Sequence, residues 1–470
     1  MNIQRTKILA TVGPSCDSTE KLQELYDKGV NCFRVNMSHG SQEQKKDFFK
    51  KIKKVKTKSK DRPTILADLS GPKIRVDAIE KDICVNKGDT VFVSNDGKTK
   101  GNIIPITKGF QFGSIHQNAK ILINDGRIQL SVMQKISEGT LECQVILGGN
   151  IQSRKGVNFP RVELDVPTLS EQDKCDLDLA IKEGADWIAL SFVRSASDAD
   201  IIQSYLSDKN VEIPVMAKIE KWEAVIDIDS IIQQFDAVMV ARGDLGAEVP
   251  LEKVPAIQKM VIKKAKRLGK PVVIATQILE SMVESSVPTR AEVSDIANAI
   301  IDGTDGLLVT GETAAGANPE AVIDVLKTVI EETENTLSFD IFDYEPRQKW
   351  FSIAHAISHA ACRVSKEVSA KHLVTMTHSG STARMISRYR PEANLIALTP
   401  NKKCFRQLQI VWGVTPLLIK KYKNADQVQG IVKQALEENN LAENNEKIVI
   451  TGGVPVGISG TTNYLSVLKI

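Results

Sequence analysis

The chain has 470 residues, 42% of them hydrophobic and 25% charged, so it can bury large cores and is long enough for two to four domains. Its 61 basic and 58 acidic residues leave a formal charge of +3, without the basic excess of a dedicated nucleic-acid-binding protein. No apolar run approaches the roughly 18 residues that span a bilayer, and the first residues lack the pattern of a secretion signal. The seven cysteines are scattered without a Cys-x-x-Cys pair, so we expect no disulfide framework, no zinc site and a cytoplasmic location.

Short β-branched runs alternate with longer amphipathic stretches through most of the first two thirds of the chain. Helical patterns such as 18–28, 171–183 and 251–268 occupy most of the gaps between or after these runs. Units of this kind in series predict a closed (β/α)₈ (TIM) barrel of parallel strands, with an open eight-stranded sheet as the alternative. The eight predicted strands are 6–12, 32–37, 64–69, 187–193, 213–219, 236–241, 271–276 and 306–310.

The pattern changes after the third predicted strand. From 72 to 167 the hydrophobic period becomes two, glycines are frequent and no helix is indicated. The segments 120–123 and 127–130 flank Asn124-Asp125-Gly126 and predict a hairpin. We interpret 72–167 as a small β-barrel domain inserted into a barrel loop, where it would act as a lid over the catalytic face. The barrel domain would then comprise 1–71 and 168–340.

A third block, 341–470, predicts a separate α/β domain. Its strand-like runs alternate with helical stretches, which is typical of a sheet covered by helices. The predicted strands are 372–377, 394–399, 414–419, 447–451 and 465–468.

Polar side chains follow the predicted barrel strands at the ends that should converge. The relevant segments are 34–40, 68–75, 218–220, 241–246, 276–277 and 310–314. Active sites of such barrels lie at the carboxyl ends of the strands, so these segments predict one shared site.

Within that site, Glu220 and Asp244 follow neighbouring strands and predict ligands for a hard divalent cation, Mg²⁺, with Mn²⁺ as a substitute. The amides of Gly243 and Asp244 are expected to open a short helix and to offer donors to a small anion. Bound metal and nearby cations together are what a phosphoryl group in transfer requires. The predicted cations are Arg34, Lys73, Arg75 and Lys218.

Each feature also has an ordinary structural explanation. A single acidic residue after a strand is usually a helix N-cap, so the convergence of several strand ends favours a site more than any one residue does. The lysine-rich segment 50–56 is interpreted as a solvated outer helix. His355 and His359 are interpreted as packing residues, because no Glu or Cys completes a zinc set nearby. Gly97-Lys98-Thr99 lacks the first glycine and the strand-to-helix context of a P-loop.

The segment 6–15 resembles the opening strand of pyruvate kinases. Six further segments resemble, in order, the active-site segments of that family: 34–40, 68–75, 216–220, 239–246, 275–282 and 311–316. The resemblance covers essentially the whole chain. It implies a barrel domain, a mobile lid domain and a C-terminal effector domain, usually in a homotetramer. It also implies Mg²⁺-dependent phosphoryl transfer from phosphoenolpyruvate to ADP, which gives pyruvate and ATP in glycolysis.

The resemblance also implies roles for individual residues. Lys218 would neutralise the phosphoryl group in transfer, Arg34 would contact the phosphate, and Thr276 would lie where the enolpyruvate is protonated. Glu220 and Asp244 would hold the Mg²⁺ that contacts the substrate. Gly243 and Asp244 complete the implied substrate site. The implied nucleotide-binding residues are Asn36, His39, Arg75 and Lys155.

The chain departs from the family pattern at the monovalent-cation site. Family members that require K⁺ carry glutamate at the position of Lys73 and commonly threonine at that of Leu69, while Asn36, Ser38 and Asp68 of the site are retained here. A fixed ammonium group supplies positive charge and repels a cation bound nearby. We therefore expect a vestigial monovalent site, with Lys73 as substitute, and no K⁺ requirement.

Two hydroxyl-rich loops in the third domain predict a phosphate site. Amides and hydroxyls at a helix start suit a phosphate, although simple helix capping is the alternative. The resemblance favours a phosphorylated allosteric activator, a sugar phosphate or AMP. The effector residues predicted from 377–382 and 459–463 are Thr377, Ser379, Gly380, Ser381, Thr382, Thr461 and Thr462.

Two other functions compete with this interpretation. A metal-dependent pyruvate aldolase or lyase would use a similar carboxylate pair, but it would need neither a nucleotide nor Lys218. A catalytically silent ligand sensor on the same scaffold would show no turnover. Nucleotide-dependent turnover separates the three.

Overall fold

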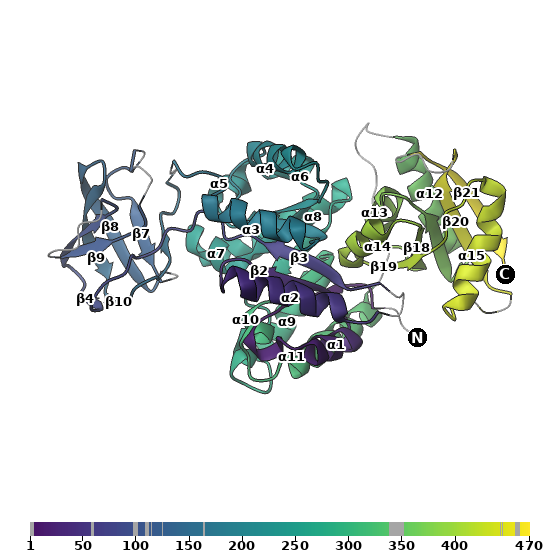
Figure 1. Cartoon of the computed structure of the whole chain (residues 1–470), viewed down its shortest axis with the longest axis horizontal. Helices are drawn as coiled ribbons and strands as arrows, with labels where there is room; N and C mark the ends of the chain where they lie inside the picture. Colours follow the sequence, from purple (N-terminus) through teal and green to yellow (C-terminus); the bar gives the residue numbers. More distant parts are fainter. Residues whose placement is uncertain are drawn as a thin grey trace.

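The computed structural model describes residues 4–470 except 58–60, 97–101, 109–111, 114, 125, 163–164, 338–351, 442, 444 and 456–460. Three bodies lie in a row, with the barrel between the inserted β domain and the C-terminal domain (Figure 1). The predicted turn residue Asp125, the Gly97-Lys98-Thr99 segment, the predicted boundary at 340 and loop residues 459–460 lie outside the described residues.

Eight parallel strands close into a barrel, as the sequence predicted, so the open-sheet alternative is wrong. The order around the barrel is β1-β16-β15-β14-β13-β12-β3-β2. The strands are β1 Lys7–Thr11, β2 Val30–Asn36, β3 Thr64–Asp68, β12 Trp187–Leu190, β13 Val215–Ile219, β14 Ala237–Ala241, β15 Val272–Ala275 and β16 Gly306–Val309.

Helices cover the outside of the barrel, and local signals define their ends. Capping boxes at Ser41, Ser170 and Thr289 begin α2, α3 and α9, and Gly269 and Gly303 at positive φ end α8 and α9. The barrel helices are α1 Thr19–Lys28, α2 Gln42–Lys54, α3 Glu171–Lys182, α4 Ser197–Asp208, α5 Trp222–Ile226, α6 Ile228–Gln234, α7 Arg242–Glu248, α8 Val254–Leu268, α9 Arg290–Asp302, α10 Gly311–Ala314 and α11 Pro319–Thr336, with 3₁₀ turns η1 Pro14–Cys16, η2 Leu251–Lys253 and η3 Glu280–Val283.

The barrel has two separate hydrophobic layers because side chains alternate along each strand. Outward residues such as Ile8 and Ala10 pack against the helices. Inward residues such as Leu9, Cys32 and Met216 fill the interior. Two positions further along the strands the inward side chains become polar, so the apolar interior forms the floor of a polar layer at the carboxyl ends.

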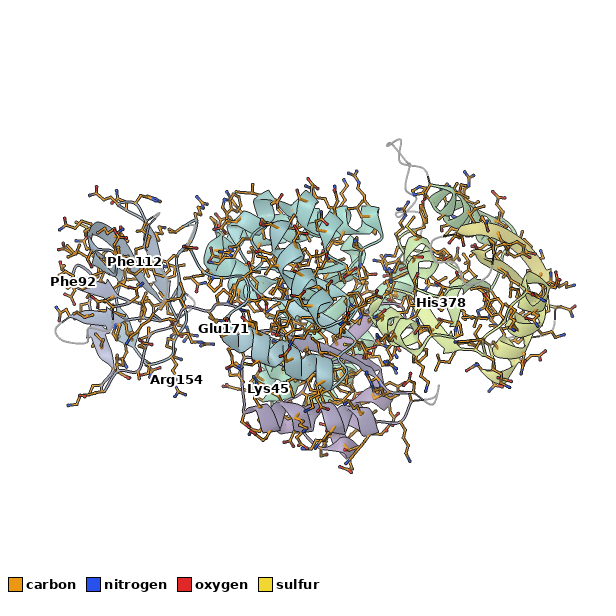
Figure 2. The ribbon with its side chains drawn as sticks, turned by 45° about the horizontal axis from the view of Figure 1, so that its top comes forward. Lys45, Phe92, Phe112, Arg154, Glu171 and His378 are labelled. Atoms are coloured by element: carbon orange, nitrogen blue, oxygen red, sulfur yellow. The ribbon has the colours of Figure 1, made fainter. Side chains whose placement is uncertain are left out.

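The inserted domain lies between β3 and α3 and consists of two sheets around one hydrophobic core. The six-stranded sheet has the order β11-β7-β8-β9-β5-β6, and β10 pairs with β4. β7 and β8 form the predicted antiparallel hairpin. Phe92 and Phe112 mark this domain in Figure 2. Its strands are β4 Ile83–Val85, β5 Thr90–Ser94, β6 Ile103–Pro105, β7 Lys120–Ile123, β8 Ile128–Ser137, β9 Thr140–Leu147, β10 Gly149–Ile151 and β11 Val157–Asn158.

Gly71 marks the start of the connection to the inserted domain. It has φ +66°, and a Cβ there would lie 2.7 Å from the Phe192 ring and 2.9 Å from the Ser191 side chain. Its amide donates to Asp173 Oδ1 at 3.0 Å, in the first turn of α3. The chain therefore leaves the barrel through a tight turn that only glycine accommodates without displacing its neighbours.

The C-terminal domain contains a five-stranded sheet of order β19-β18-β17-β20-β21, in which only β21 is antiparallel to its neighbour. This matches the predicted α/β domain. The strands are β17 His372–Met376, β18 Asn394–Thr399, β19 Val414–Leu418, β20 Lys447–Gly453 and β21 Thr462–Lys469. The helices are α12 Ile353–Glu367, α13 Ser381–Ser387, α14 Lys402–Gln407 and α15 Val428–Glu438, with 3₁₀ turns η5 Leu408–Ile410 and η6 Ala425–Gln427.

The C-terminal domain packs against the amino-terminal ends of the barrel strands. Ile410 belongs to the hydrophobic cluster inside the barrel and closes its floor. Arg390 is 2% exposed, lies 3.4 Å from Asp305 Oδ2, and donates to Gly303 O at 2.6 Å. Trp412 lies beneath the same guanidinium, 4.4 Å from it, so the two domains share a buried polar anchor. In the described parts of the chain, no helix is long and apolar enough to cross a membrane.

Candidate active site

A cluster of charged side chains occupies the carboxyl ends of β2, β3 and β13. Each lies two residues after a member of the interior core, with Arg34 after Cys32, Asp68 after Leu66 and Lys218 after Met216. The strand period of two therefore directs these polar groups into the barrel mouth. Barrel closure then brings β2, β3 and β13 close enough for contacts among the three side chains.

Lys218 lies at the centre of the cluster. Its ammonium is 2.9 Å from Glu220 Oε1 and 3.2 Å from Asp68 Oδ1, and it donates to Ser191 Oγ at 2.7 Å. Burial disfavours the charged amine, but the two carboxylates outweigh burial and raise the pKa of Lys218 above its ordinary value. Lys218 is therefore a permanent positive charge in a site that is only 9% exposed.

Asp68 connects Lys218 to Arg34. Its Oδ2 accepts from Arg34 Nε at 2.6 Å, and Arg34 Nη1 also donates to Thr11 Oγ1 at 3.1 Å. Burial acts to raise the pKa of Asp68, yet the charges of Lys218 and Arg34 lower it overall. The carboxylate thus stays ionised and fixes the direction of both cations.

Glu220 has one oxygen that accepts a hydrogen bond and one that is paired only with the charge of Lys218. Oε2 accepts the Phe192 amide at 2.8 Å. Oε1 is close to Lys218 but makes no hydrogen bond within the described part of the chain, although Glu220 is only 1% exposed. Burial and the nearby Asp244 charge raise the pKa of Glu220. A buried carboxylate oxygen of this kind fits coordination to a cation.

Asp244 is the second predicted metal ligand, and it lies in the first turn of α7. Its Oδ1 is 3.4 Å from Lys73 Nζ, and its side chain is 28% exposed. Among the described residues no group of three or more His, Cys, Asp or Glu side chains could hold a metal. Glu220 and Asp244, the pair predicted to bind Mg²⁺, lie near enough for the Asp244 charge to act on the pKa of Glu220.

Thr276 has a strained backbone at the end of β15. It has φ +67° and the following Gln277 has φ +52°, a region that a β-branched residue rarely adopts. Arg242 holds this turn by donating to Thr276 O at 3.0 Å and to Gln277 O at 2.6 Å. The Thr276 hydroxyl accepts the Gly243 amide at 2.8 Å, so this predicted anion donor is already bonded to the protein.

These contacts define a preorganised cluster of cations and carboxylates, and comparisons show which proteins share its framework. The chain matches the family models "Pyruvate kinase, barrel domain" over residues 3–323 and "Pyruvate kinase, alpha/beta domain" over residues 355–468. It belongs to the pyruvate kinase family.

Individual relatives agree over nearly the whole chain. A pyruvate kinase of Thermotoga maritima is 40% identical, with 100% of each chain covered. A pyruvate kinase of Methylorubrum extorquens is 38% identical over 99% of this chain and 97% of its own. A crystal structure of a pyruvate kinase from Cryptosporidium parvum superposes with a TM-score of 0.92 at 33% identity, covering 99% of this chain and 96% of that one.

The residues that the family resemblance assigned to the nucleotide lie on two domains. Asn36 Nδ2 is 3.0 Å from His39 Nδ1 at the end of β2. Arg75 pairs with Gly156 across the base of the inserted domain and donates to Arg154 O at 2.9 Å. Arg154 lies in the inserted domain in Figure 2, one residue before Lys155. Burial is the main cause that lowers the pKa of His39, and nearby cations lower it further. These cations give the region after β2 an excess of positive charge.

The residues predicted to form a vestigial monovalent-cation site lie at and after the ends of β2 and β3. Asn36 Oδ1 accepts the Ser38 amide at 3.1 Å, and Leu69 is buried at 1% exposure. Asp68 is already neutralised by two protein cations. Lys73 lies 5.9 Å from the Phe192 ring and points its ammonium toward Asp244.

The predicted effector residues lie in two places, at the start of α13 and at the start of β21. Thr382 Oγ1 and Thr462 Oγ1 are 2.6 Å apart and both residues are buried. Thr461 directly precedes Thr462 in the sequence. Gly380 has φ +81° and donates to Thr377 Oγ1 at 2.9 Å. Ser379 and Ser381 line a cavity together with residues of the barrel. His378 marks this loop in Figure 2.

Sequence reasoning missed several residues that hold the site together. Ser191 bridges Lys218 and Leu69 O, and the Phe192 amide holds Glu220. Both residues follow β12, a strand at whose carboxyl end no site residue was predicted. Arg242 stands beside Gly243 in a segment that was identified, but its action on Thr276 depends on tertiary contacts.

Proposed function

We propose that this chain is a pyruvate kinase, which transfers the phosphoryl group of phosphoenolpyruvate to ADP and yields pyruvate and ATP. The observation that carries the proposal is the buried cluster of Arg34, Asp68, Lys218 and Glu220 on a scaffold of this family. A phosphoryl group in transfer spreads negative charge over its oxygens, and fixed cations stabilise that charge without reorganisation.

The protein's own groups have distinct tasks in this proposal. Lys218 neutralises the phosphoryl oxygens, because its raised pKa keeps it charged. Arg34 orients the phosphate, since Asp68 and Thr11 fix its guanidinium. Thr276, Gly243 and Asp244 border the position of the enolpyruvate, and the strained Thr276 turn holds a hydroxyl near the carbon that gains a proton.

We propose Glu220 and Asp244 as the protein ligands of Mg²⁺, with Mn²⁺ as a substitute. Glu220 Oε1 supports this assignment, because it is buried, accepts no hydrogen bond from the described residues and has only the Lys218 charge beside it. When bound, the metal would supply additional positive charge for the substrate oxygens.

Asn36, His39, Arg75 and Lys155 are proposed to bind the nucleotide. Burial and then nearby cations lower the pKa of His39; the cations support this assignment, because ADP phosphates are attracted to positive charge. Arg75 and Lys155 belong to the connection with the inserted domain. Closure of that domain would therefore complete the nucleotide site.

Turnover without K⁺ is proposed from the charge arrangement. Asp68 already has two cationic partners, and Lys73 adds a fixed ammonium beside Asp244. An additional monovalent cation would be repelled by these groups. Leu69 offers only an apolar side chain at the remaining position.

Activation by a phosphorylated metabolite is proposed for the C-terminal domain, in a cytoplasmic homotetramer. The hydroxyl groups and amides gathered at Thr377–Thr382 and Thr461–Thr462 support a phosphate ligand such as a sugar phosphate or AMP. Replacing Ser379 and Ser381 by alanine should abolish activation and spare basal turnover.

The deciding experiment measures pyruvate formation from phosphoenolpyruvate with and without ADP, in Mg²⁺ or EDTA, and in Na⁺ or K⁺ salts at constant ionic strength. The expected result is ADP- and Mg²⁺-dependent turnover in both salts. Turnover only in K⁺ would retain the kinase and overturn the role of Lys73. Pyruvate release without ADP would indicate a lyase, and no turnover would indicate a sensor.

A further inference from the structure

Thr313 is a fully buried threonine that has no task in the proposed catalytic site. It lies in α10, the single helical turn that follows β16, within one of the polar segments at the carboxyl ends of the strands. In the described part of the chain, both hydrogen bonds of its hydroxyl are made with Thr11, the last residue of β1. The hydroxyl therefore connects α10 to the end of a neighbouring barrel strand.

The hydroxyl of Thr313 takes the place of a strand contact. β1 and β16 pair in parallel as far as Ala10 and Val309, and the chain after β16 then turns into α10. At the next residue of β1, the Thr11 amide donates to Thr313 Oγ1 at 3.1 Å, and Thr313 Oγ1 donates to Thr11 O at 2.9 Å. Thr11 is only 3% exposed, so its amide and carbonyl need partners within the protein. One hydroxyl supplies both partners.

The helical turn α10 is itself fixed in position. Glu312 is fully buried, and its two carboxylate oxygens accept backbone amides at 3.0 Å and 2.6 Å. A Cβ at Gly13 would lie 2.5 Å from Ala314 O, so the chain that follows β1 packs directly against α10. Thr313 is therefore a rigid support for Thr11.

The side chain of Thr11 connects this support to Arg34. The Thr11 hydroxyl donates to Val309 O at 2.9 Å, which leaves its lone pairs for a donor, and it accepts from Arg34 Nη1 at 3.1 Å. Asp68 accepts from Nε of the same guanidinium at 2.6 Å. Among the described residues, Arg34 Nη2 makes no hydrogen bond. Two fixed contacts thus orient the guanidinium and leave its Nη2 group for a ligand.

We infer that Thr313 is a positioning residue for the phosphate of phosphoenolpyruvate, and that it acts through Thr11 on Arg34. The inference rests on the proposed function, which assigns Arg34 to that phosphate. Hydrogen bonds from a guanidinium to a phosphate require aligned donors. Without the Thr313 hydroxyl, the amide and carbonyl of Thr11 lose their partners, and the Thr11 side chain no longer holds Arg34 in one orientation.

The expected defect is specific to the phosphate. A misdirected Arg34 weakens the binding of phosphoenolpyruvate, whereas pyruvate, which has no phosphate, binds as it does to the wild type. Lys218 keeps its contacts with Asp68 and Glu220, because neither involves Thr313. A purely structural role of Thr313 would weaken the binding of both ligands.

Titration calorimetry of the full-length protein in Mg²⁺ would measure the affinities for phosphoenolpyruvate and for pyruvate. Thr313→Val removes the hydroxyl with little change of shape, and Thr313→Ser keeps it. Thr11→Val removes the next hydroxyl on the path and tests the same path where Thr313→Val does not fold. Thr304→Val is the matched control, because Thr304 is fully buried before the opposite end of β16, with its hydroxyl 3.0 Å from both Val272 O and Gly306 O.

Thr313→Val and Thr11→Val should each weaken the binding of phosphoenolpyruvate about tenfold and change that of pyruvate less than about twofold. Thr313→Ser should restore the affinity for phosphoenolpyruvate to within about threefold of the wild type, because it keeps the hydroxyl. Thr304→Val should keep both affinities although its melting temperature falls. In an Arg34→Met background, Thr313→Val should cause no further loss, because both changes act on one guanidinium.

Four results would overturn the role of Thr313. These are wild-type affinity for phosphoenolpyruvate in either valine variant, an equal loss for pyruvate, an equal loss in Thr304→Val, and a full additional loss in the Arg34→Met background. Failure of Thr313→Ser to restore binding would do the same.

Turnover of the same variants separates this inference from the proposed kinase activity. Thr313→Val should raise the KM for phosphoenolpyruvate by a factor similar to its loss of affinity and leave the KM for ADP unchanged. The phosphate-specific loss, found in a protein whose wild type shows no ADP-dependent turnover, would overturn the kinase and leave the role of Thr313 standing. ADP-dependent turnover with an unchanged KM for phosphoenolpyruvate in both valine variants would overturn the role of Thr313 and leave the kinase standing.

Discussion

Replacement of Lys218 by methionine tests the central cation while it keeps most of the side chain's apolar stem. The ammonium contacts Glu220 Oε1 at 2.9 Å and Asp68 Oδ1 at 3.2 Å in a nearly buried site. Asp68 still has Arg34 as a cationic partner in this variant. Glu220 loses its cationic partner and keeps only the hydrogen bond from the Phe192 amide. We expect kcat to fall by about 10²–10³, the scale for removing one preorganised electrostatic group.

The same substitution should also lower the free energy of unfolding. Removing one partner of a buried ion pair costs about 3–5 kcal/mol, and the lower end applies because Asp68 stays paired. Without Lys218 the pKa of Glu220 rises further above its unfolded value, so the neutral acid is favoured in the folded protein. The loss in free energy of unfolding, relative to the wild type, should therefore grow as the pH rises above the unfolded pKa of glutamate. It should shrink at acidic pH.

Lys221→Met is the matched control for this experiment. Lys221 pairs with buried Glu248 at 2.6 Å, next to the site in sequence but outside the cluster. Steady-state turnover and urea unfolding at pH 8 and pH 5.5 would be measured for both variants. The assignment of Lys218 is refuted if Lys218→Met keeps more than about a tenth of wild-type kcat, or if Lys221→Met loses as much activity.

Three further predictions concern other parts of the molecule. Lys73→Glu should make turnover dependent on K⁺, because it removes the fixed ammonium and adds a carboxylate; salts of Na⁺ and K⁺ at equal ionic strength are compared. Glu220→Gln should weaken Mn²⁺ binding at least about tenfold, measured by electron paramagnetic resonance, because it removes an anionic metal ligand. Arg390→Met should destabilise the docked C-terminal domain by about 3 kcal/mol, followed by Trp412 fluorescence on heating, because buried Asp305 loses its cationic partner and keeps only the Val272 and Trp412 amides.

Each of these predictions has a clear contrary result. Equal turnover of Lys73→Glu in both salts would show that the ammonium does not replace K⁺. Unchanged Mn²⁺ affinity in Glu220→Gln would move the metal site elsewhere. A wild-type melting profile for Arg390→Met would show that the Asp305 pair does not hold the two domains together.

The arrangement of the barrel and part of the site followed from the sequence by itself. Eight alternations of strand and helix predicted closure, and the closed barrel is confirmed. Lys218 and Glu220 are two residues apart, so the strand period alone predicts that both point to one side. The carboxylates and cations at the barrel mouth and the inserted β domain were predictable because each depends on local periodicity and on the rule that strand ends converge.

Only the tertiary structure decided how these residues are paired. Arg34 and Asp68 meet across adjacent strands, and Ser191 joins Lys218 to the end of β3, contacts that depend on strand register. The orientation of Lys73 toward Asp244 likewise depends on the turn at Gly71. The cavity beneath the barrel exists because two separately predicted domains dock. Local periodicity carries information about which face a side chain occupies, whereas pairing distances depend on barrel closure and domain docking.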